Sequence, residues 1–305
     1  LVILSQLLGR GEQTIIFVST RHHVEMVHEL LTAANYEPAA IYGSLDPAAR
    51  KIALGRFRAG KAKVLVVTDV AARGIDVPLL DNVLNFDFPT KPKLFVHRAG
   101  RAARAGRSGR AISLVEPEEM PYLVDLHLYL GRSLRPVPLG EEGPSSSSAA
   151  AANGRVGAND DVPLAVLPPS TLEIEVEYVN RQLNANPELD ALHRVAMRSL
   201  QMVRKTRPAA SKASVARARS LPKELGIHPL CTDKVDVGAE ARRSSMLTDL
   251  KTFKPNAGSA AVGVSNHKGL FGEKAKGSLK RHYNELAASG ISRNGGGGVV
   301  EEDDE

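Results

Sequence analysis

The stretch His97-Arg98-Ala99-Gly100-Arg101-Ala102-Ala103-Arg104-Ala105-Gly106-Arg107 places four arginines and two glycines directly before an apolar run at residues 111–115. Arginine holds phosphate well, because its planar guanidinium donates two parallel hydrogen bonds and stays charged. Glycine lets a backbone turn and approach a ligand closely. A basic loop that only faces solvent would have the same composition. The segments upstream are therefore needed to tell a phosphate-binding loop from a solvated one.

Three such segments precede the arginine loop in a fixed order. They are residues 15–20 (Ile-Ile-Phe-Val-Ser-Thr), 68–78 (Thr-Asp-Val-Ala-Ala-Arg-Gly-Ile-Asp-Val-Pro) and 83–89 (Val-Leu-Asn-Phe-Asp-Phe-Pro). Together with the loop they resemble motifs IV, V, Va and VI of the DEAD-box RNA helicases. The resemblance covers residues 1–138 and implies the second RecA-like domain of that family. The related DEAH-type helicases usually open the last motif with Gln-Arg, so the His97-Arg98 opening favours the DEAD-box branch.

The pattern of apolar residues predicts the fold independently of that resemblance. Short apolar runs alternate with helical patterns, and Val64-Leu65-Val66-Val67 is apolar on both faces, as in a covered parallel strand. The alternation predicts an α/β fold, a doubly wound parallel sheet of the RecA-like kind. We expect its strands at residues 15–18, 39–42, 64–67, 83–86 and 111–115.

Polar residues mark where the helices of this domain begin. Thr20 can cap one helix, and Asp46-Pro47 can open the next, with Ala49, Ile52 and Phe57 facing inward. A closing helix is expected at residues 118–130, ended by Gly131. The second RecA-like domain is therefore assigned to residues 1–139.

The rest of the chain divides by composition. Residues 140–169 are rich in serine, alanine and glycine and predict a flexible linker. Residues 170–255 predict a basic helical extension, in which a capping box at residues 170–173 and Asn186-Pro187 begin the two helices of a hairpin. The alternation at residues 172–178 would also suit a strand, but the cap favours a helix. Residues 256–305 are glycine-rich and end in an acidic run, which predicts a disordered tail.

Bulk composition narrows the possible partners. A net charge of +6 over 305 residues suits a protein that binds a polyanion. The single cysteine, Cys231, excludes an internal disulfide framework, and no metal site is indicated. No apolar run is long enough to cross a bilayer, so no membrane partner is expected. The chain begins Leu1-Val2-Ile3 without methionine, and we expect it to be a fragment.

The resemblance implies roles at an ATP site for the arginine loop and for the segment at residues 68–78. Arg101 and Arg104 would be the catalytic arginines, reaching across a cleft to ATP; pairing within their own domain is the alternative. Asp76 would accept a hydrogen bond from the ATP ribose, or else serve as an ordinary turn residue. Arg73, also assigned to the ATP site, would lie at the boundary with the first RecA-like domain, near the catalytic carboxylates of that domain. His97 and Arg98 would organise the cleft.

RNA contacts are expected to reach phosphate and sugar, because a helicase must accept any sequence. The resemblance implies them for Arg50, Thr68 and Gly74, and for Thr20, which suits a helix cap equally well. Two positions depart from the family pattern: Pro47 stands where the family has glutamine, and Ala103 where it usually has glycine.

The run from Arg204 to Lys223 holds seven basic residues and no acidic one. It would add RNA affinity, form a solvated helix face or serve as a nuclear localisation patch.

Two motifs of an ATPase are not found in this chain. It has no G-x-x-x-x-G-K-[S/T] phosphate loop and no Asp-Glu-Ala-Asp sequence. ATP with Mg²⁺ would thus be bound mainly by a first RecA-like domain outside the chain, which alone should not hydrolyse ATP.

Two segments, one before and one within the extension, indicate a subfamily and so a more specific function. Residues 121–128 (Pro-Tyr-Leu-Val-Asp-Leu-His-Leu) and 225–230 (Leu-Gly-Ile-His-Pro-Leu) resemble the nucleolar DEAD-box subfamily of large ribosomal subunit assembly. This resemblance implies an ATP-dependent RNA helicase of the nucleus and nucleolus, with pre-ribosomal particles as partners. A non-catalytic RNA-binding assembly factor with a relic helicase domain is the alternative, and a helicase acting on DNA is disfavoured by His97-Arg98.

Overall fold

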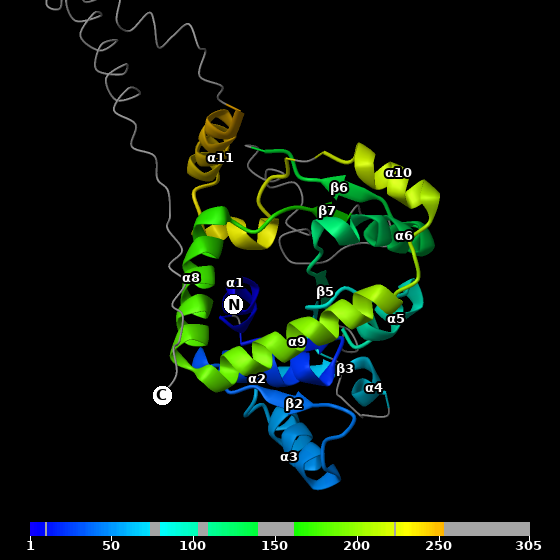
Figure 1. Cartoon of the computed structure of the whole chain (residues 1–305), viewed down its shortest axis with the longest axis vertical. Helices are drawn as coiled ribbons and strands as arrows, with labels where there is room; N and C mark the ends of the chain where they lie inside the picture. Colours follow the sequence, from blue (N-terminus) through cyan, green and yellow to red (C-terminus); the bar gives the residue numbers. More distant parts are fainter. Residues whose placement is uncertain (10, 74–79, 103–108, 140–161, 223, 253–305) are drawn as a thin grey trace, which may run out of the picture. The chain divides into compact units, whose positions relative to one another are not determined.

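The computed structural model describes residues 1–9, 11–73, 80–102, 109–139, 162–222 and 224–252 (Figure 1). The chain forms two compact units, Leu1–Met246 and Leu247–Glu305. In the second unit only the end of helix α11 (Val237–Thr252) is described. The predicted tail at residues 256–305 and residues 140–161 of the predicted linker lie outside the described residues.

Five parallel strands form the central sheet, in the order β2-β3-β1-β4-β5. The middle strand pairs on both sides, so Thr14 lies opposite Val64 and Asn82. The predicted α/β doubly wound fold is confirmed, and every predicted strand is present. The strands are β1 (Thr14–Val18), β2 (Ala39–Ile41), β3 (Val64–Thr68), β4 (Asn82–Asn85) and β5 (Arg110–Ser113).

Alternate side chains of the sheet enter two different hydrophobic cores. In β1, Ile15 and Phe17 join Phe57 of α3 (Pro47–Arg58) on one face. Ile16 and Val18 join α2 (Arg21–Ala33) and α1 (Val2–Leu8) on the other. Burial on both faces explains why the strands are continuous apolar runs in the sequence.

Both predicted helix caps are present. Oγ1 of Thr20 accepts a hydrogen bond from the backbone N–H of His23 at 3.2 Å and begins α2. Oδ2 of Asp46 accepts from the N–H groups of Ala48 and Ala49 at 3.0 and 3.2 Å and begins α3. Each cap satisfies backbone donors that have no partner within the helix.

The predicted inward face of α3 is wrong at one position. Ile52 is 65% exposed, whereas Ala53, Leu54 and Phe57 contact the core. A helix turns by 3.6 residues, so a residue five positions before Phe57 lies about 140° away from it around the axis.

The extension begins with a helical hairpin, as predicted, formed by α8 (Pro169–Ala185) and α9 (Pro187–Thr206). Asn186 joins them, and its side chain accepts hydrogen bonds from the first backbone N–H groups of α9. The predicted capping box is wrong, because α8 starts at Pro169 without a side-chain cap. Glu173, the expected box residue, pairs instead with Arg243 of α11 at 2.6 Å.

Helix α9 lies along α2 and completes one face of the sheet layer (Figure 1). Ala196 of α9 is fully buried in the same core as Val24 and Val27 of α2. The extension therefore shares a hydrophobic core with the sheet instead of packing only on itself.

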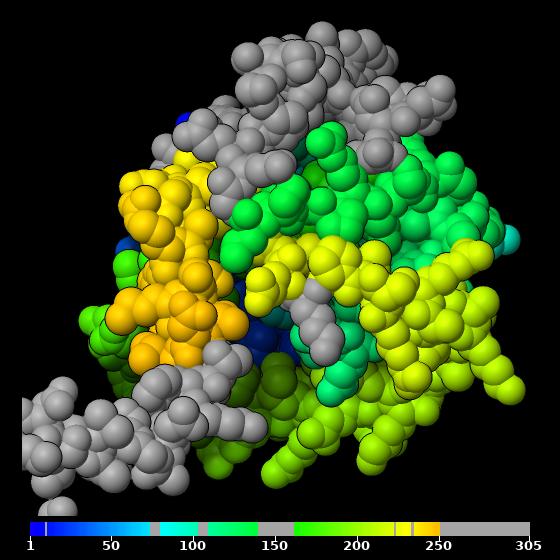
Figure 2. Space-filling model, turned by 90° about the horizontal axis from the view of Figure 1, so that it is seen from above, coloured from blue at the N-terminus to red at the C-terminus, as the bar shows by residue number. Residues whose placement is uncertain are grey.

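A second contact between the extension and the sheet domain includes part of the predicted linker. Within that linker, β7 (Val162–Leu164) forms a strand that pairs in parallel with β6 (Leu134–Pro136). Beyond it, Val166 bridges to Ile227. Helix α10 (Lys212–Ser220) packs on α6 (Met120–Leu130), and Figure 2 shows the yellow α10 segment beside the green surface of α6.

Candidate functional site

The carboxyl ends of β1, β3 and β4 meet at one edge of the sheet, where ligands of parallel α/β sheets usually bind. Ser19 and Thr20 follow β1, Asp69 follows Thr68 at the end of β3, and Asp87 follows β4. Thr20 and Thr68, both expected to contact RNA, lie in these segments.

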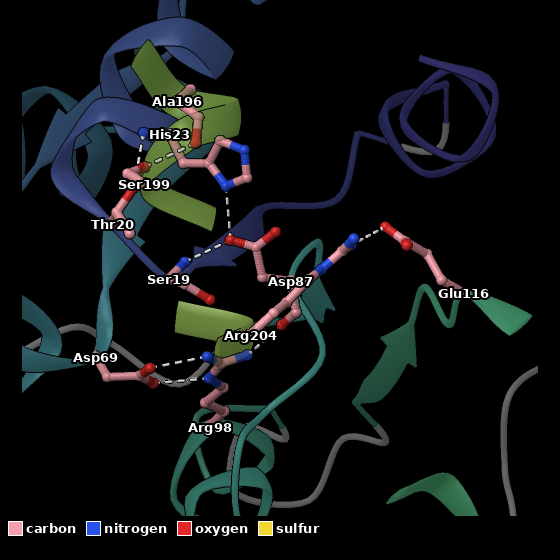
Figure 3. A network of polar contacts seen from close by, with 10 residues as sticks. All are labelled: Ser19, Thr20, His23, Asp69, Asp87, Arg98, Glu116, Ala196, Ser199 and Arg204. Atoms are coloured by element: carbon pink, nitrogen blue, oxygen red, sulfur yellow. Dashed lines mark hydrogen bonds and ion pairs between the residues drawn. The ribbon is translucent and has the colours of Figure 1, made fainter. Parts of the chain in front are cut away.

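Arg98 is the centre of this edge (Figure 3). It lies on α5 (Pro92–Ala99), is 2% exposed, and donates to both carboxylate oxygens of Asp69 at 2.7 and 2.8 Å. Its Nη1 donates to Oδ1 of Asn85 at 3.1 Å and to the carbonyl oxygen of Asp87 at 2.8 Å. The guanidinium also lies 5.1 Å from the ring centroid of Phe17. One buried cation thus ties the ends of three strands together.

Sequence analysis assigned no role to Asp69. In the structure its carboxylate is the partner of Arg98. A buried arginine needs a carboxylate, since an unpaired buried charge is costly. An aspartate directly after a strand that ends at the same edge is the signal that could have identified this partner.

Asp87 and His23 form a second buried link that the sequence did not reveal. Oδ2 of Asp87 accepts from the backbone N–H of Ser19 at 2.6 Å and contacts Nδ1 of His23 at 2.7 Å. His23 is fully buried and meets the ring of Phe86 edge-on at 5.9 Å. These contacts hold the end of β1 against the end of β4.

The two threonines expected at RNA have hydroxyls that already serve the protein. Oγ1 of Thr20 caps α2 and also lies 2.8 Å from Oγ of Ser199 on α9 (Figure 3). Oγ1 of Thr68, which is almost fully buried, accepts from the N–H of Ala71 at 3.4 Å in α4 (Asp69–Ala72). Of the two readings of Thr20, the helix cap is confirmed, and contact with RNA stays a prediction.

Arg50 braces the loop between β2 and α3. Its Nη2 donates to the carbonyl oxygens of Tyr42 and Gly43, both at 3.1 Å. Its Nε is buried and, within the described part of the chain, has no hydrogen-bond partner. Pro47 occupies the first turn of the same helix, where its missing N–H costs nothing.

Arg101 combines an anchored backbone with an unengaged side chain. Its N–H donates to the carbonyl of Arg98 at 3.0 Å, and its own carbonyl accepts from Leu80 N–H at 3.0 Å. Among the described residues, its guanidinium has no hydrogen bond or ion pair. Such a side chain is free to bind an anionic group without first breaking an internal pair.

Two further predicted residues, Arg73 and His97, have exposed side chains. Arg73 is exposed at the end of α4, and His97 is exposed on α5, so Arg98 rather than His97 makes the buried contacts at this edge. Gly74, Asp76 and Arg104 lie outside the described residues, and so does Ala103.

The described residues fit a polyphosphate better than a metal ion. Arg101 and Arg73 offer guanidinium donors, which suit the phosphates of a nucleotide. No group of three or more His, Cys, Asp or Glu side chains within the described ranges could hold a metal. None of the helices described there is long and apolar enough to span a membrane.

The five-stranded parallel sheet, with functional side chains at its carboxyl edge, agrees with the RecA-like fold that the sequence predicts. In agreement, residues 1–106 match the family model described as the helicase conserved C-terminal domain.

Curated relatives identify the family within this class. The chain is 43% identical over 256 residues to "Putative DEAD-box ATP-dependent RNA helicase 29" of Arabidopsis thaliana, covering 84% of this chain and 30% of that protein. It is 44% identical over 255 residues to "ATP-dependent RNA helicase DDX54" of Mus musculus, covering 83% and 28%. With "ATP-dependent RNA helicase dbp10" of Schizosaccharomyces pombe it shares 38% identity over 286 residues, covering 93% and 32%.

The chain belongs to the DEAD-box family of RNA helicases, as the second RecA-like domain with a C-terminal extension. It spans about a third of the length of the curated relatives it matches. The likeness extends well beyond residue 106, so these relatives share the extension as well as the sheet domain.

Proposed function

We propose that the whole protein is an ATP-dependent RNA helicase, in which this chain supplies half of the ATP site and half of the RNA site. The observation that carries the proposal is Arg101, whose backbone is anchored at the sheet edge while its guanidinium is unengaged among the described residues. The names of the relatives support it, since each is called an ATP-dependent RNA helicase.

At the ATP site, Arg101 and Arg104 would stabilise the charge that develops on the transferred phosphoryl group. Asp76 would bind the ribose, and Arg73 would lie at the seam. ATP with Mg²⁺ would be bound mainly by the first RecA-like domain. An arginine in this position can contribute a factor of about 10³–10⁵ to the rate.

RNA would bind along the same face through Arg50, Thr68, Gly74 and Thr20, mostly by contacts to phosphate and sugar. ATP and RNA would then both favour the closed arrangement of the two RecA-like domains, and hydrolysis would reopen it. The alternative, a relic domain that only binds RNA, has no support from the relatives' names.

The basic run at residues 204–223 divides into two groups. Arg204 and Arg207 pair with Glu116 and Glu119 of the sheet domain. Exposed side chains without a partner among the described residues remain for RNA: Lys205, Lys212, Arg217 and Arg219. We propose that these four residues add sequence-independent affinity through phosphate contacts.

The place of action would be the nucleus and nucleolus, with pre-ribosomal particles of the large subunit as partners. This part of the proposal depends on the resemblance of residues 121–128 and 225–230 to the ribosome-assembly subfamily. The likeness to the relatives across the extension supports it.

The experiment is RNA-stimulated ATP hydrolysis by the full-length protein and by its Arg101→Ala form. We expect turnover to fall by about 10³–10⁵ in the variant, while filter binding shows that ATP and RNA still bind. Arg181→Ala is the control, because Arg181 is exposed on α8 and, among the described residues, pairs only with Glu177 at 3.7 Å. RNA binding without turnover in the wild type, or normal turnover in Arg101→Ala, would contradict the proposal.

A further inference from the structure

We propose that Arg207, at the end of α9 in the extension, is a positioning residue for helix α5 and through it for Arg101. The inference rests on the proposed function, since it assigns Arg207 an effect on the catalytic arginine. Nothing in the arginine loop itself points to residue 207, which lies 106 positions after Arg101 in the chain.

Arg207 is a buried link between the extension and the sheet domain. Only 5% of its side chain is exposed. Its Nη1 donates to Oε1 of Glu119 at 2.8 Å, and its Nη2 donates to the carbonyl oxygen of Pro89 at 2.9 Å. The guanidinium lies 3.6 Å from the ring centroid of Tyr122 and 5.5 Å from that of Phe88. Removing it would leave a carboxylate, a carbonyl and two rings without their common partner.

The environment of Glu119 shows that the pair is desolvated. Burial raises the pKa of the Glu119 carboxyl above its ordinary value, while a backbone hydrogen bond at Glu116 and the charge of Arg207 act in the opposite direction. A buried carboxylate is destabilised when its cation is removed. The pairing with Glu119 therefore holds the Arg207 side chain in one position.

The segment that Arg207 holds leads directly into α5. Pro89 lies three residues before Pro92, the first residue of the helix, and the N-cap residue Lys91 makes no side-chain cap hydrogen bond. Beside the contact between Arg207 and Pro89 lies a cavity of about 220 Å³, lined in part by Phe88, Pro92 and Arg207. Phe88 packs with Phe95 of α5 and Leu123 of α6 in a hydrophobic core, and the hydrogen bond from Arg207 adds a polar restraint at Pro89, beside this cavity.

The other end of α5 carries the functional arginines. The helix has eight residues and is about 12 Å long, Arg98 lies in its last turn, and Arg101 is bonded to it through the backbone. Because Arg98 fixes the end of the helix at the sheet edge, a shift at the start of α5 would turn the helix about Arg98 and change the direction in which Arg101 leaves it. Since an error of about 1 Å in the placement of a catalytic group can cost about 10²-fold in rate, the restraint at Pro89 matters for Arg101.

The chain offers a matched control on the same helix. Arg204 also pairs with a glutamate of the sheet domain, Glu116, but both side chains are substantially exposed, at 37% and 54%. An exposed pair of this kind contributes little. Arg207→Gln and Arg204→Gln therefore remove the same charge from α9, and only the first releases the segment before α5.

The test compares these two variants in the full-length protein. We expect Arg207→Gln to lower kcat for RNA-stimulated ATP hydrolysis by about 10²-fold, with the affinity for ATP unchanged, and Arg204→Gln to behave as wild type. In a double-mutant cycle with Arg101→Ala, Arg207→Gln should add little further loss, because both act on one interaction. A purely structural role would give a loss that is independent of Arg101.

Hydrogen exchange supplies a readout that does not depend on turnover. The amides of α5 should lose protection in Arg207→Gln and keep it in Arg204→Gln. If Arg207→Gln does not fold, Arg207→Lys replaces it, because lysine keeps the charge without the planar fork. Unchanged exchange over α5, unchanged kcat, or an additive double mutant would overturn the role of Arg207. A wild-type protein without RNA-stimulated turnover would instead contradict the proposed function.

Discussion

Two regions of the molecule bury an arginine in nearly the same way. At the sheet edge, Arg98 meets the carboxylate of Asp69, the carbonyl of Asp87 and the ring of Phe17. At the seam between the sheet domain and the extension, Arg207 meets a carboxylate, a carbonyl and an aromatic ring in the same manner. The bonds of Arg98 join residues 29 or fewer positions apart, whereas Arg207 reaches Glu119 across 88 positions.

This difference explains why only one of the two regions is visible in the sequence. The partners of Arg98 follow strands that run parallel, so their ends must meet at one edge. The partners of Arg207 meet it only because α9 packs along α2, and no local pattern specifies that packing. The chain therefore buries Arg98 inside a recognisable motif and Arg207 outside one.

The largest expected loss of stability comes from removing Arg98 at the sheet edge. Arg98→Ala removes the only cation that the described residues place against Asp69 and leaves that carboxylate and the Asp87 carbonyl without their donor. We expect the free energy of unfolding to fall by about 3–5 kcal/mol, as for other broken buried pairs, measured by urea denaturation of the full chain.

Arg204→Ala is the comparison for that experiment, because its pair with Glu116 is exposed. It should cost about 0–1 kcal/mol. Similar losses for Arg98→Ala and Arg204→Ala would mean that burial of Arg98 does not decide its contribution.

The second largest expected loss of stability comes from a close backbone contact at the seam between the sheet domain and the extension. Gly226 donates its N–H to the carbonyl of Val137 at 2.7 Å, and a Cβ at residue 226 would lie 2.2 Å from the carbonyl oxygen of Pro138. Gly226→Ala must push the two segments apart, which we expect to cost about 1–3 kcal/mol in urea denaturation.

Gly55→Ala provides the matched control, since a Cβ at residue 55 would meet nothing within 4 Å in the described structure. Within helix α3 the same substitution should stabilise by roughly 0.5–1 kcal/mol, because alanine favours the helix. A neutral Gly226→Ala would show that the extension does not approach the sheet domain as closely as the structure has it.

The sheet edge and the seam also differ in how much could be predicted. Strands buried on both faces and caps such as Asp46 have strong local signals, and these predictions were confirmed. Ile52 was misplaced because its side chain is apolar, although its position on the helix faces solvent. The capping box at residues 170–173 is absent because α8 begins at Pro169, one residue before Ser170, which places Ser170 inside the helix and not at its cap.

The residues of the candidate site also divide into those with a local signal in the sequence and those brought together only by packing. The resemblance implied that Arg98 organises the cleft, but no role was assigned to Asp69, His23 or Asp87, because the sequence does not show which side chains at the strand ends become buried partners. Thr20 was predicted with two readings, and its contact with Ser199 could not be foreseen because the extension had been separated from the sheet domain by a linker.

The smallest expected effect is a pH dependence of stability at His228, where the extension meets the sheet domain. His228 follows the bridge at Ile227, and its Nδ1 accepts a hydrogen bond from the N–H of Leu230 to begin the 3-10 helix η2 (Pro229–Lys234). Burial lowers the pKa of His228 below its ordinary value of 6.5. The unfolded chain therefore binds a proton more readily, and stability should fall as the pH drops below 6.5.

His228→Asn isolates this contribution, because asparagine can accept the same cap hydrogen bond and does not titrate. Burial also lowers the pKa of His127, but His127 is present in both proteins and its effect cancels in the comparison. We expect the urea midpoint of the wild type to fall relative to that of His228→Asn as the pH drops from about 7.5 to 5.5, across the ordinary histidine pKa. Parallel pH profiles would mean that the His228 proton is not linked to folding, and the seam would then depend on Arg207 and Gly226 rather than on this cap.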